Sequence, residues 1–311
     1  MKINLTNIKK AEKILNKNEC VAVPTETVYG LAGNAYSDKA CKKIFKLKKR
    51  PKNNPLIVHY YNPKNLKKDC SFNDNFIKLY KKFCPGPITF VLNLKKNSRI
   101  SRIATNNKKS LAVRFPKHKV TRELLKKLNY PLAAPSANLS SKLSAVSSKD
   151  VKEEFGKNIK YILDGGKSSI GIESTIVDLR NRPKILRLGG LETSLIEKIL
   201  NKKVLINNNP LKISFPGQQK LHYSPGIPIR LNVKKIINKN EAYLLIRKRK
   251  KNRKNYFFLS KNGNLKEAAR NLYSMLRKVK KNKYKSIAVV KIPNRGLGKT
   301  INDRLLRASK F

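Results

Sequence analysis

The residues best suited to chemistry are concentrated between positions 24 and 59. An apolar run ending at Val23 predicts a strand, a helix-like segment follows, and Leu56–His59 predicts another strand. This strand–helix–strand unit carries hydroxyls, two cations, an amide and an imidazole, namely Thr25, Thr27, Lys48, Arg50, Asn54 and His59. Cations at a helix end can simply complement the helix dipole. Combined with the hydroxyls and the imidazole, they favour a site for a small anion.

A second candidate is Arg114, which lies in the apolar stretch Leu111–Phe115. A guanidinium on a buried strand is costly unless an anion pairs with it. The partner is either an internal Asp or Glu, or a ligand carboxylate held bidentately. Because the chain has only 18 acidic residues, a ligand carboxylate is favoured, while an internal ion pair stays open.

Small and polar residues form two further candidate segments. The first combines alanines with Ser136 and Asn138, which could bind phosphate or ribose, although such a run is also typical of an ordinary turn. The second, at 165–178, contains Gly-Lys-Ser, but Tyr161 stands where a phosphate-binding P-loop has its leading glycine. We therefore exclude a P-loop NTPase and interpret Ser174 as part of a strand edge that lines a ligand.

Short apolar runs alternate with segments of helical periodicity through the first two hundred residues. The predicted strands are Cys20–Val23, Leu56–Val58, Ile88–Leu94, Leu111–Phe115, Leu132–Ala134, Thr175–Asp178 and Lys184–Arg187. The predicted helices are Ile8–Lys17, Asp38–Lys46, Asn73–Phe83, Lys119–Leu128, Ser148–Phe155 and Leu195–Leu200. Two strands with a loop between them follow position 88, so the pattern predicts an α/β fold with a twisted, mixed sheet instead of a regular alternation.

The segment 206–229 is rich in Pro and Gly and has no helical period, which predicts an ordered linker between two domains. The domains would span 1–205 and 230–311, and the second is expected to be a smaller, Rossmann-like α/β domain. Its predicted elements are strands at Ala242–Arg247, Tyr256–Leu259 and Ile287–Ile292 and a helix at Leu265–Lys278.

The composition sets limits on partners and compartment. A formal charge of +54 attracts phosphates, but lysines recur throughout the chain, so we attribute the charge mainly to compositional drift, with weak attraction to RNA, including tRNA, as a by-product. Four cysteines without a C-x-x-C pair and three separated histidines make a zinc site unexpected. The N-terminus lacks an apolar leader, and no run approaches the roughly 20 apolar residues of a membrane span. We expect a reduced, cytoplasmic protein without membrane contact.

Several motifs, in order, resemble the threonylcarbamoyl-AMP synthase family. They are Pro-Thr-Glu-Thr-Val-Tyr-Gly-Leu, Lys-x-Arg-Pro-x-x-Asn-Pro-Leu-Ile-Val-His, Cys-Pro-Gly-Pro-Ile-Thr, Val-Arg-Phe-Pro, Pro-Ser-Ala-Asn and Glu-Ser-Thr-Ile-Val-Asp. The linker motif Phe-Pro-Gly…His-Tyr-Ser-Pro resembles the family's long, two-domain form. Lys49 departs from the small residue that is usual there, and the final domain looks short.

The resemblance implies a YrdC-like catalytic domain and roles for individual residues. The positions around threonine match Thr27, His59, Arg114 and Ser174, with Ala134 lining the same cavity. The positions around ATP match Arg50, Asn54, Ser136, Ser144, Arg187 and Tyr223, with Ser110 contributing backbone. The family's polar catalytic tetrad matches Lys48, Arg50, Ser136 and Asn138.

The resemblance also implies a reaction, in which L-threonine, bicarbonate and ATP give threonylcarbamoyladenylate and pyrophosphate. Mg²⁺ would accompany ATP without a metal site in the protein, and the product would pass to the machinery that modifies adenosine in tRNA. Tyr223 makes the linker a candidate lid over ATP. The alternatives are a non-catalytic RNA-binding module of the same fold and a transferase that takes a carbamoyl group from another donor.

Overall fold

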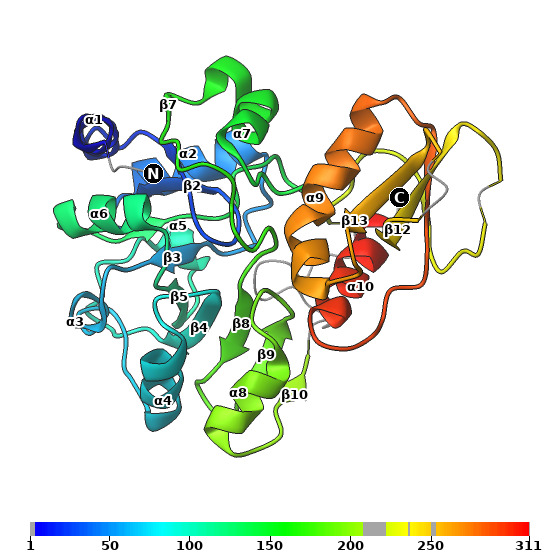
Figure 1. Ribbon diagram of the computed structural model, residues 1–311. Coiled ribbons are helices and arrows are strands. Elements are labelled where there is room, and N and C mark those ends of the chain that lie inside the picture. The colour runs from blue at the N-terminus through cyan, green and yellow to red at the C-terminus, as the bar shows by residue number, and fades with distance from the viewer. Residues whose placement is uncertain (1–3, 208–221, 236, 250–252, 311) are drawn as a thin grey trace.

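The computed structural model describes residues 4–207, 222–235, 237–249 and 253–310, which form two α/β units (Figure 1). Most of the predicted linker, from 208 to 221, lies outside the described residues. The prediction that the linker is a lid over ATP can therefore be compared with the structure only around residues 222 and 223.

The first unit is built on a ten-stranded mixed sheet, which confirms the predicted fold class. Its spatial order is β10-β9-β8-β4-β5-β3-β6-β2-β1-β7. In chain order the strands are β1 (Val21–Val23), β2 (Gly30–Asn34), β3 (Ile57–His59), β4 (Ile88–Asn93), β5 (Ser110–Arg114), β6 (Leu132–Ala133), β7 (Tyr161–Ile162), β8 (Thr175–Asp178), β9 (Lys184–Arg187) and β10 (Leu205–Ile206). Parallel and antiparallel pairs occur side by side, since β5 runs parallel to β3 and antiparallel to β4.

The prediction of a simple strand–helix–strand unit after position 20 was wrong, because β2 intervenes. This strand pairs antiparallel with β1, and the sequence Gly-Leu-Ala-Gly-Asn conceals it by lacking any β-branched residue. Gly33 packs its bare backbone against helix α2, where an added Cβ would lie 3.2 Å from Ile44 Cδ1. The strand therefore depends on tertiary packing more than on intrinsic propensity.

Eight α-helices belong to the first unit within the described residues. They are α1 (Leu5–Asn16), α2 (Asp38–Lys48), α3 (Pro63–Leu66), α4 (Asp74–Phe83), α5 (Arg102–Thr105), α6 (Lys119–Lys127), α7 (Ser148–Phe155) and α8 (Thr193–Leu200), with a 3₁₀ turn, η1, at Gly156–Asn158. Local capping explains their starts: the Ser37 hydroxyl accepts from the N–H of Ala40, and Ser147 forms a capping box with Asp150.

The second unit has a four-stranded sheet in the order β11-β14-β12-β13, with every pair parallel. Its elements are β11 (Ile229–Arg230), β12 (Glu241–Arg247), β13 (Tyr256–Ser260), α9 (Leu265–Lys281), β14 (Ser286–Val289) and α10 (Leu297–Ala308). The sequence analysis missed α10 because glycines flank its start. Gly298 is required there, since an added Cβ would lie 1.9 Å from the carbonyl oxygen of Pro293.

A shared apolar core joins the two units. It combines α9 and α10 side chains with residues of the first unit, including Val28, Leu143 and Ile172. In Figure 1 these two helices, orange and red, lie on the side of the second unit that faces the first. The second unit is thus packed against the first and is not merely tethered to it.

All four cysteines are free thiols. Within the described residues, no helix combines the length and the apolar character needed to cross a lipid bilayer.

We expect Phe76→Ala to lower the free energy of unfolding by about 3–5 kcal/mol, because it empties an aromatic cluster in the main core. The Phe76 ring centroid lies 4.7 Å from that of Phe72 and 5.0 Å from that of Phe90. Urea denaturation measures the change. The matched control is Ile77→Ala, since Ile77 is the next residue of α4 and is 41% exposed. Its effect should stay within about 0.5 kcal/mol, and equal effects of the two variants would contradict this account of the core.

Candidate active site

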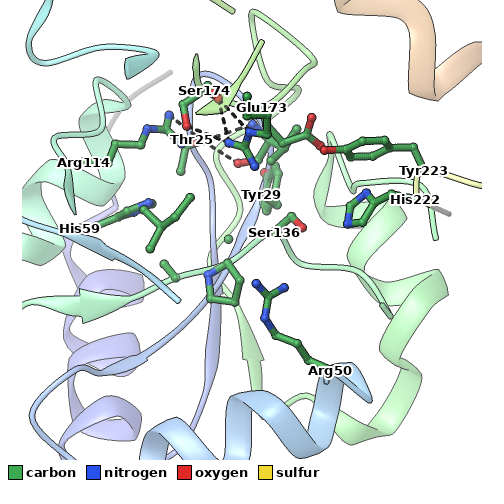
Figure 2. Close-up of a pocket in the computed structure, with 16 residues that line it drawn as sticks. Thr25, Tyr29, Arg50, His59, Arg114, Ser136, Glu173, Ser174, His222 and Tyr223 are labelled. Atoms are coloured by element: carbon green, nitrogen blue, oxygen red, sulfur yellow. Dashed lines mark hydrogen bonds between the residues drawn. The ribbon is translucent and has the colours of Figure 1, made fainter. Parts of the chain in front are cut away.

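A buried pocket lies where the first sheet meets residues 222 and 223 (Figure 2). The residues that line it are Thr25, Val28, Tyr29, Gly30, Arg50, Ile57, His59, Arg114, Ala134, Pro135, Ser136, Glu173, Ser174, Arg187, His222 and Tyr223. Figure 2 shows Arg114 and His59 at one end, His222 and Tyr223 at the other, and Arg50 below. The two ends of the pocket therefore carry different side chains.

The segment after β1 bends, and Thr25 stabilises the bend. Its hydroxyl accepts from the N–H of Thr27 and Val28 and donates to the carbonyl oxygen of Val28. The Thr27 hydroxyl lies 2.9 Å from that of Thr25 but does not line the pocket. Of the two hydroxyls, the structure places Thr25 on the wall and Thr27, the predicted threonine contact, behind it.

Strand pairing brings His59 and Arg114 together, because they are register partners in β3 and β5. The Arg114 guanidinium donates to Glu26 Oε1 at 2.7 Å, so the internal ion pair that the sequence left open exists. Arg114 Nε and His59 Nδ1 are buried and find no hydrogen-bond partner among the described residues. Burial, followed by the charge of Arg114, holds the pKa of His59 well below its usual range, so the imidazole is neutral at pH 7.

Another part of the wall is fixed by Arg187 at the end of β9. Its Nε and Nη2 donate to the carbonyl oxygen of Ser174 at 3.1 and 2.8 Å, and Nη2 also reaches the Ser174 hydroxyl at 3.1 Å. That hydroxyl lies 2.7 Å from the Thr89 hydroxyl. The two predicted residues, one for ATP and one for threonine, therefore form one hydrogen-bonded unit.

Arg50 is held in place by the loop that follows α2. Its Nε donates to the Asn54 carbonyl oxygen at 2.9 Å, and Nη2 donates to Asn54 Oδ1 at 2.6 Å and to the Pro55 carbonyl oxygen at 3.0 Å. Asn54, predicted at ATP, thus lies behind the wall and orients Arg50. Burial and then repulsion from Arg187 lower the pKa of Arg50 to about 9.

Lys48 also lies behind the wall. Its Nζ donates to the carbonyl oxygens of Ser136 and Asn138, each at 2.5 Å, and burial is the main reason that its pKa is well below the usual range. The Asn138 amide donates to the carbonyl oxygens of Leu139 and Lys142. The predicted tetrad is therefore assembled, with Arg50 and Ser136 on the wall and the other two shaping the loop beneath Ser136.

Two other predicted residues are set back from the pocket. Ser110 begins β5, far along the strand from Arg114, which ends it. Ser144 donates to Glu173 Oε1 at 2.5 Å. Their predicted roles at ATP are not visible as wall contacts.

Sequence reasoning missed part of the wall, including Tyr29, Glu173 and His222. Tyr29 donates to the carbonyl oxygen of Gly166 at 2.8 Å. Glu173 and His222 are chain neighbours of the predicted Ser174 and Tyr223, so adjacency was the available signal. The scarcity of acidic residues could also have singled out Glu173.

The unpartnered polar atoms show what the pocket can bind. His222 Nδ1 and the Tyr223 hydroxyl join His59 Nδ1 and Arg114 Nε as buried polar atoms without a hydrogen-bond partner among the described residues. Such atoms are rare in folded proteins and indicate a ligand that completes them. The guanidinium groups of Arg50 and Arg187 repel one another, so an anion bound between them would be stabilised.

Comparison with known proteins agrees with this geometry. Residues 13–189 match the model of the Sua5–YciO–YrdC family, described as "Telomere recombination", and residues 191–310 match the threonylcarbamoyl-AMP synthase C-terminal domain. The threonylcarbamoyl-AMP synthases of Pyrococcus abyssi and Bacillus subtilis are each 33% identical, over 98% of this chain and 94% of theirs.

Solved structures give the same result. The crystal structure of P. abyssi Sua5 complexed with L-threonine superposes with a TM-score of 0.90 at 32% identity, covering 99% of this chain and 96% of that one. Escherichia coli YciO, at 22% identity and a TM-score of 0.55 over 60% of this chain, shares the fold of the first unit. The chain belongs to the threonylcarbamoyl-AMP synthase family in its two-domain Sua5 form.

Proposed function

We propose that this chain catalyses the formation of L-threonylcarbamoyladenylate and pyrophosphate from L-threonine, bicarbonate and ATP. The observation that carries the proposal is the pocket itself: unneutralised guanidinium groups and unpartnered polar atoms face one buried space. The family membership and the threonine bound to the P. abyssi relative support it. Nothing in the comparisons favours a non-catalytic RNA-binding module.

The end of the pocket at Arg114 and His59 suits threonine. Glu26 holds Arg114 Nη2, which leaves Nε for the threonine carboxylate. Neutral His59 can exchange a hydrogen bond with the threonine hydroxyl without adding charge. Ile57 and Ala134 offer apolar surface for the methyl group.

The other end suits the nucleotide. Arg50 and Arg187 supply positive charge for the phosphates, and Tyr223 and His222 close this end with unpartnered polar atoms. Arg50 stays charged at pH 7 even with its lowered pKa. Fixed charge of this kind stabilises the charge that develops on the α-phosphate.

The reaction requires no protein nucleophile. The threonine amine attacks the carbon of bicarbonate, water is lost and a carbamate forms. A carbamate oxygen then attacks the α-phosphorus of ATP while the bond from that phosphorus to the β-phosphate group breaks. Pyrophosphate leaves, which makes the enzyme a nucleotidyltransferase. The protein contributes positioning and charge neutralisation. The product would be consumed by the machinery that transfers the threonylcarbamoyl group to tRNA.

We propose that Mg²⁺ enters with ATP. Among the described residues that line the pocket, Glu173 is the one with a carboxylate, and it already accepts from Arg304 and Tyr273. The phosphate oxygens and water would therefore supply the ligands, and the ion would shield the negative charge of the triphosphate.

We retain the predicted division into residues 1–205, 206–229 and 230–311 as a proposal, and likewise the cytoplasm as the compartment. The two separate sheets support the division, although β10 still pairs with β9 of the first sheet. The free thiols support a reducing compartment.

Pyrophosphate release tests the proposed function. The complete mixture of ATP, Mg²⁺, bicarbonate and L-threonine should release pyrophosphate, and omission of threonine or of bicarbonate should each reduce the rate to background. A coupled phosphate assay measures it. Pyrophosphate release that continues at the same rate without threonine and without bicarbonate would contradict the synthase assignment.

Arg114→Lys should raise the KM for threonine by about 10–100-fold, because a lysine keeps the charge but loses the directed guanidinium donors. Initial rates at saturating ATP measure this change. Arg102→Lys is the matched control, since Arg102 is exposed and does not line the pocket. An unchanged KM in a folded Arg114 variant would remove Arg114 from the threonine site.

The free energy of unfolding should fall as the pH drops from about 6.5 to 5. Burial is the main cause of the lowered pKa values of His59 and His222, and His222 falls to about 3. Both histidines stay neutral in the folded state while they gain a proton when unfolded, so each contributes a loss of up to about 1.4 kcal/mol per pH unit below 6.5. Urea denaturation of the wild type and of His222→Gln measures this slope. In the variant, the slope of the free energy of unfolding against pH should be smaller by the contribution of about one proton. Identical slopes in the two proteins would contradict a neutral His222.

A further inference from the structure

A buried polar cluster from both units lies directly behind the pocket wall. Glu173 is 5% exposed and lines the pocket, and its carboxylate accepts from the Tyr273 hydroxyl at 2.9 Å and from Arg304 Nε at 2.9 Å. Tyr273 comes from α9 and Arg304 from α10, whereas Glu173 lies two residues before the start of β8. A carboxylate of the active-site wall is therefore held by two side chains of the second unit.

Arg304 makes two additional contacts, one with Leu188 beside the pocket wall and one with Tyr223 on it. Its Nη2 donates to the carbonyl oxygen of Leu188 at 2.6 Å, just beyond the end of β9. Its guanidinium carbon lies 4.6 Å from the centre of the Tyr223 ring. Arg304 is 1% exposed, so these contacts are shielded from solvent. One side chain of the last helix thus contacts two residues of the pocket wall, Glu173 and Tyr223, and the residue that follows a third, Arg187.

Two of the contacts of Arg304 fall next to residues that we propose to bind the ligands. Glu173 precedes Ser174, and Leu188 follows Arg187, which donates to Ser174. Backbone contact is close here as well, since a Cβ on Gly189 would lie 2.3 Å from the amide nitrogen of Thr175. A shift of Glu173 or Leu188 would consequently move the Ser174–Arg187 unit.

Charge adds a second reason why the cluster controls the wall. Burial alone would raise the pKa of Glu173, but Arg304, Arg187 and the Ser144 hydrogen bond outweigh it and lower the pKa to about 2. Without Arg304, the buried carboxylate would lose its direct ion-pair partner. It would then protonate or turn toward Arg187, the other cation that stabilises its charge.

We propose that Arg304 and Tyr273 are positioning residues for the active site: they hold Glu173 and Leu188 so that Ser174 and Arg187 keep their ligand-binding geometry. The second unit then supports the active-site wall from behind. This inference deepens the proposed function and rests on it for the identity of the ligand, L-threonine.

Another contact between the units supplies the matched control. Lys281 of α9 donates to Glu153 of α7 at 2.6 Å, and these side chains are 53% and 33% exposed. Neither residue lines the pocket. Lys281→Gln therefore removes an ion pair between the units without reaching the wall.

The test measures the Kd for L-threonine by calorimetry, together with KM and kcat, in Arg304→Gln, Arg304→Lys, Tyr273→Phe and Lys281→Gln. We expect Arg304→Gln to weaken threonine binding at least tenfold and to lower kcat. Tyr273→Phe should weaken binding about threefold to tenfold. Arg304→Lys should recover part of the loss because it keeps a charge beside Glu173. Lys281→Gln should stay within twofold of the wild type.

Wild-type affinity in Tyr273→Phe and the Arg304 variants would overturn the inference, and so would an equal loss in Lys281→Gln. If Arg304→Gln does not fold, Tyr273→Phe decides alone, because it removes only a hydroxyl. Pyrophosphate release by the wild type judges the proposed function separately from these affinity ratios. A wild-type chain that binds threonine but releases no pyrophosphate would overturn only the proposed function, and one that does neither would overturn both.

Discussion

Positive charge must be buried around this pocket without being neutralised by the protein itself. A buried cation needs partners, yet a carboxylate on each one would leave no attraction for a polyphosphate. The structure satisfies these cations mainly with backbone carbonyl oxygens: those of residues 136 and 138 serve Lys48, those of 54 and 55 serve Arg50, and that of 174 serves Arg187. Carbonyl groups accept the hydrogen bonds but leave the net charge in place. The loops around the pocket therefore adopt conformations that direct these carbonyl oxygens toward the buried cations.

Arg114 is treated differently, and the difference separates the two ends of the pocket. Its charge is offset by Glu26, which also accepts from the N–H of Lys117. This end is close to neutral and suits an amino acid, which carries both signs. The end with Arg50 and Arg187 keeps its excess charge and suits a polyanion. Charge compensation, and not only shape, thus distinguishes the two ends at which we propose that threonine and ATP bind.

The sequence predicted the fold class and many of the residues that gather at the pocket, but not which of them face it. Motif order grouped Thr27, Lys48 and Asn54 with Arg50, and the structure places the first three behind the wall. Spacing along a bend or a loop does not determine the direction of a side chain, because tertiary hydrogen bonds decide it. The same limit hid β2, whose Gly-rich sequence is held as a strand by its neighbours. Helix α10 was missed for a related reason, since its first turn tolerates only glycine at 298.

Four of the 18 acidic residues form ion pairs where the two units meet. In these pairs, all between described residues, the acid lies on the first unit and the base on the second: Asp150 and Glu154 with Arg277, Glu153 with Lys281, and Glu173 with Arg304. Such one-sided complementarity fixes the orientation of docking. The exposed pair at Lys281 is screened by salt, while the pair at Arg304 is buried and much less affected. Salt therefore weakens the exposed pair at Lys281 more than the buried pair at Arg304, which is the one in contact with the pocket wall through Glu173.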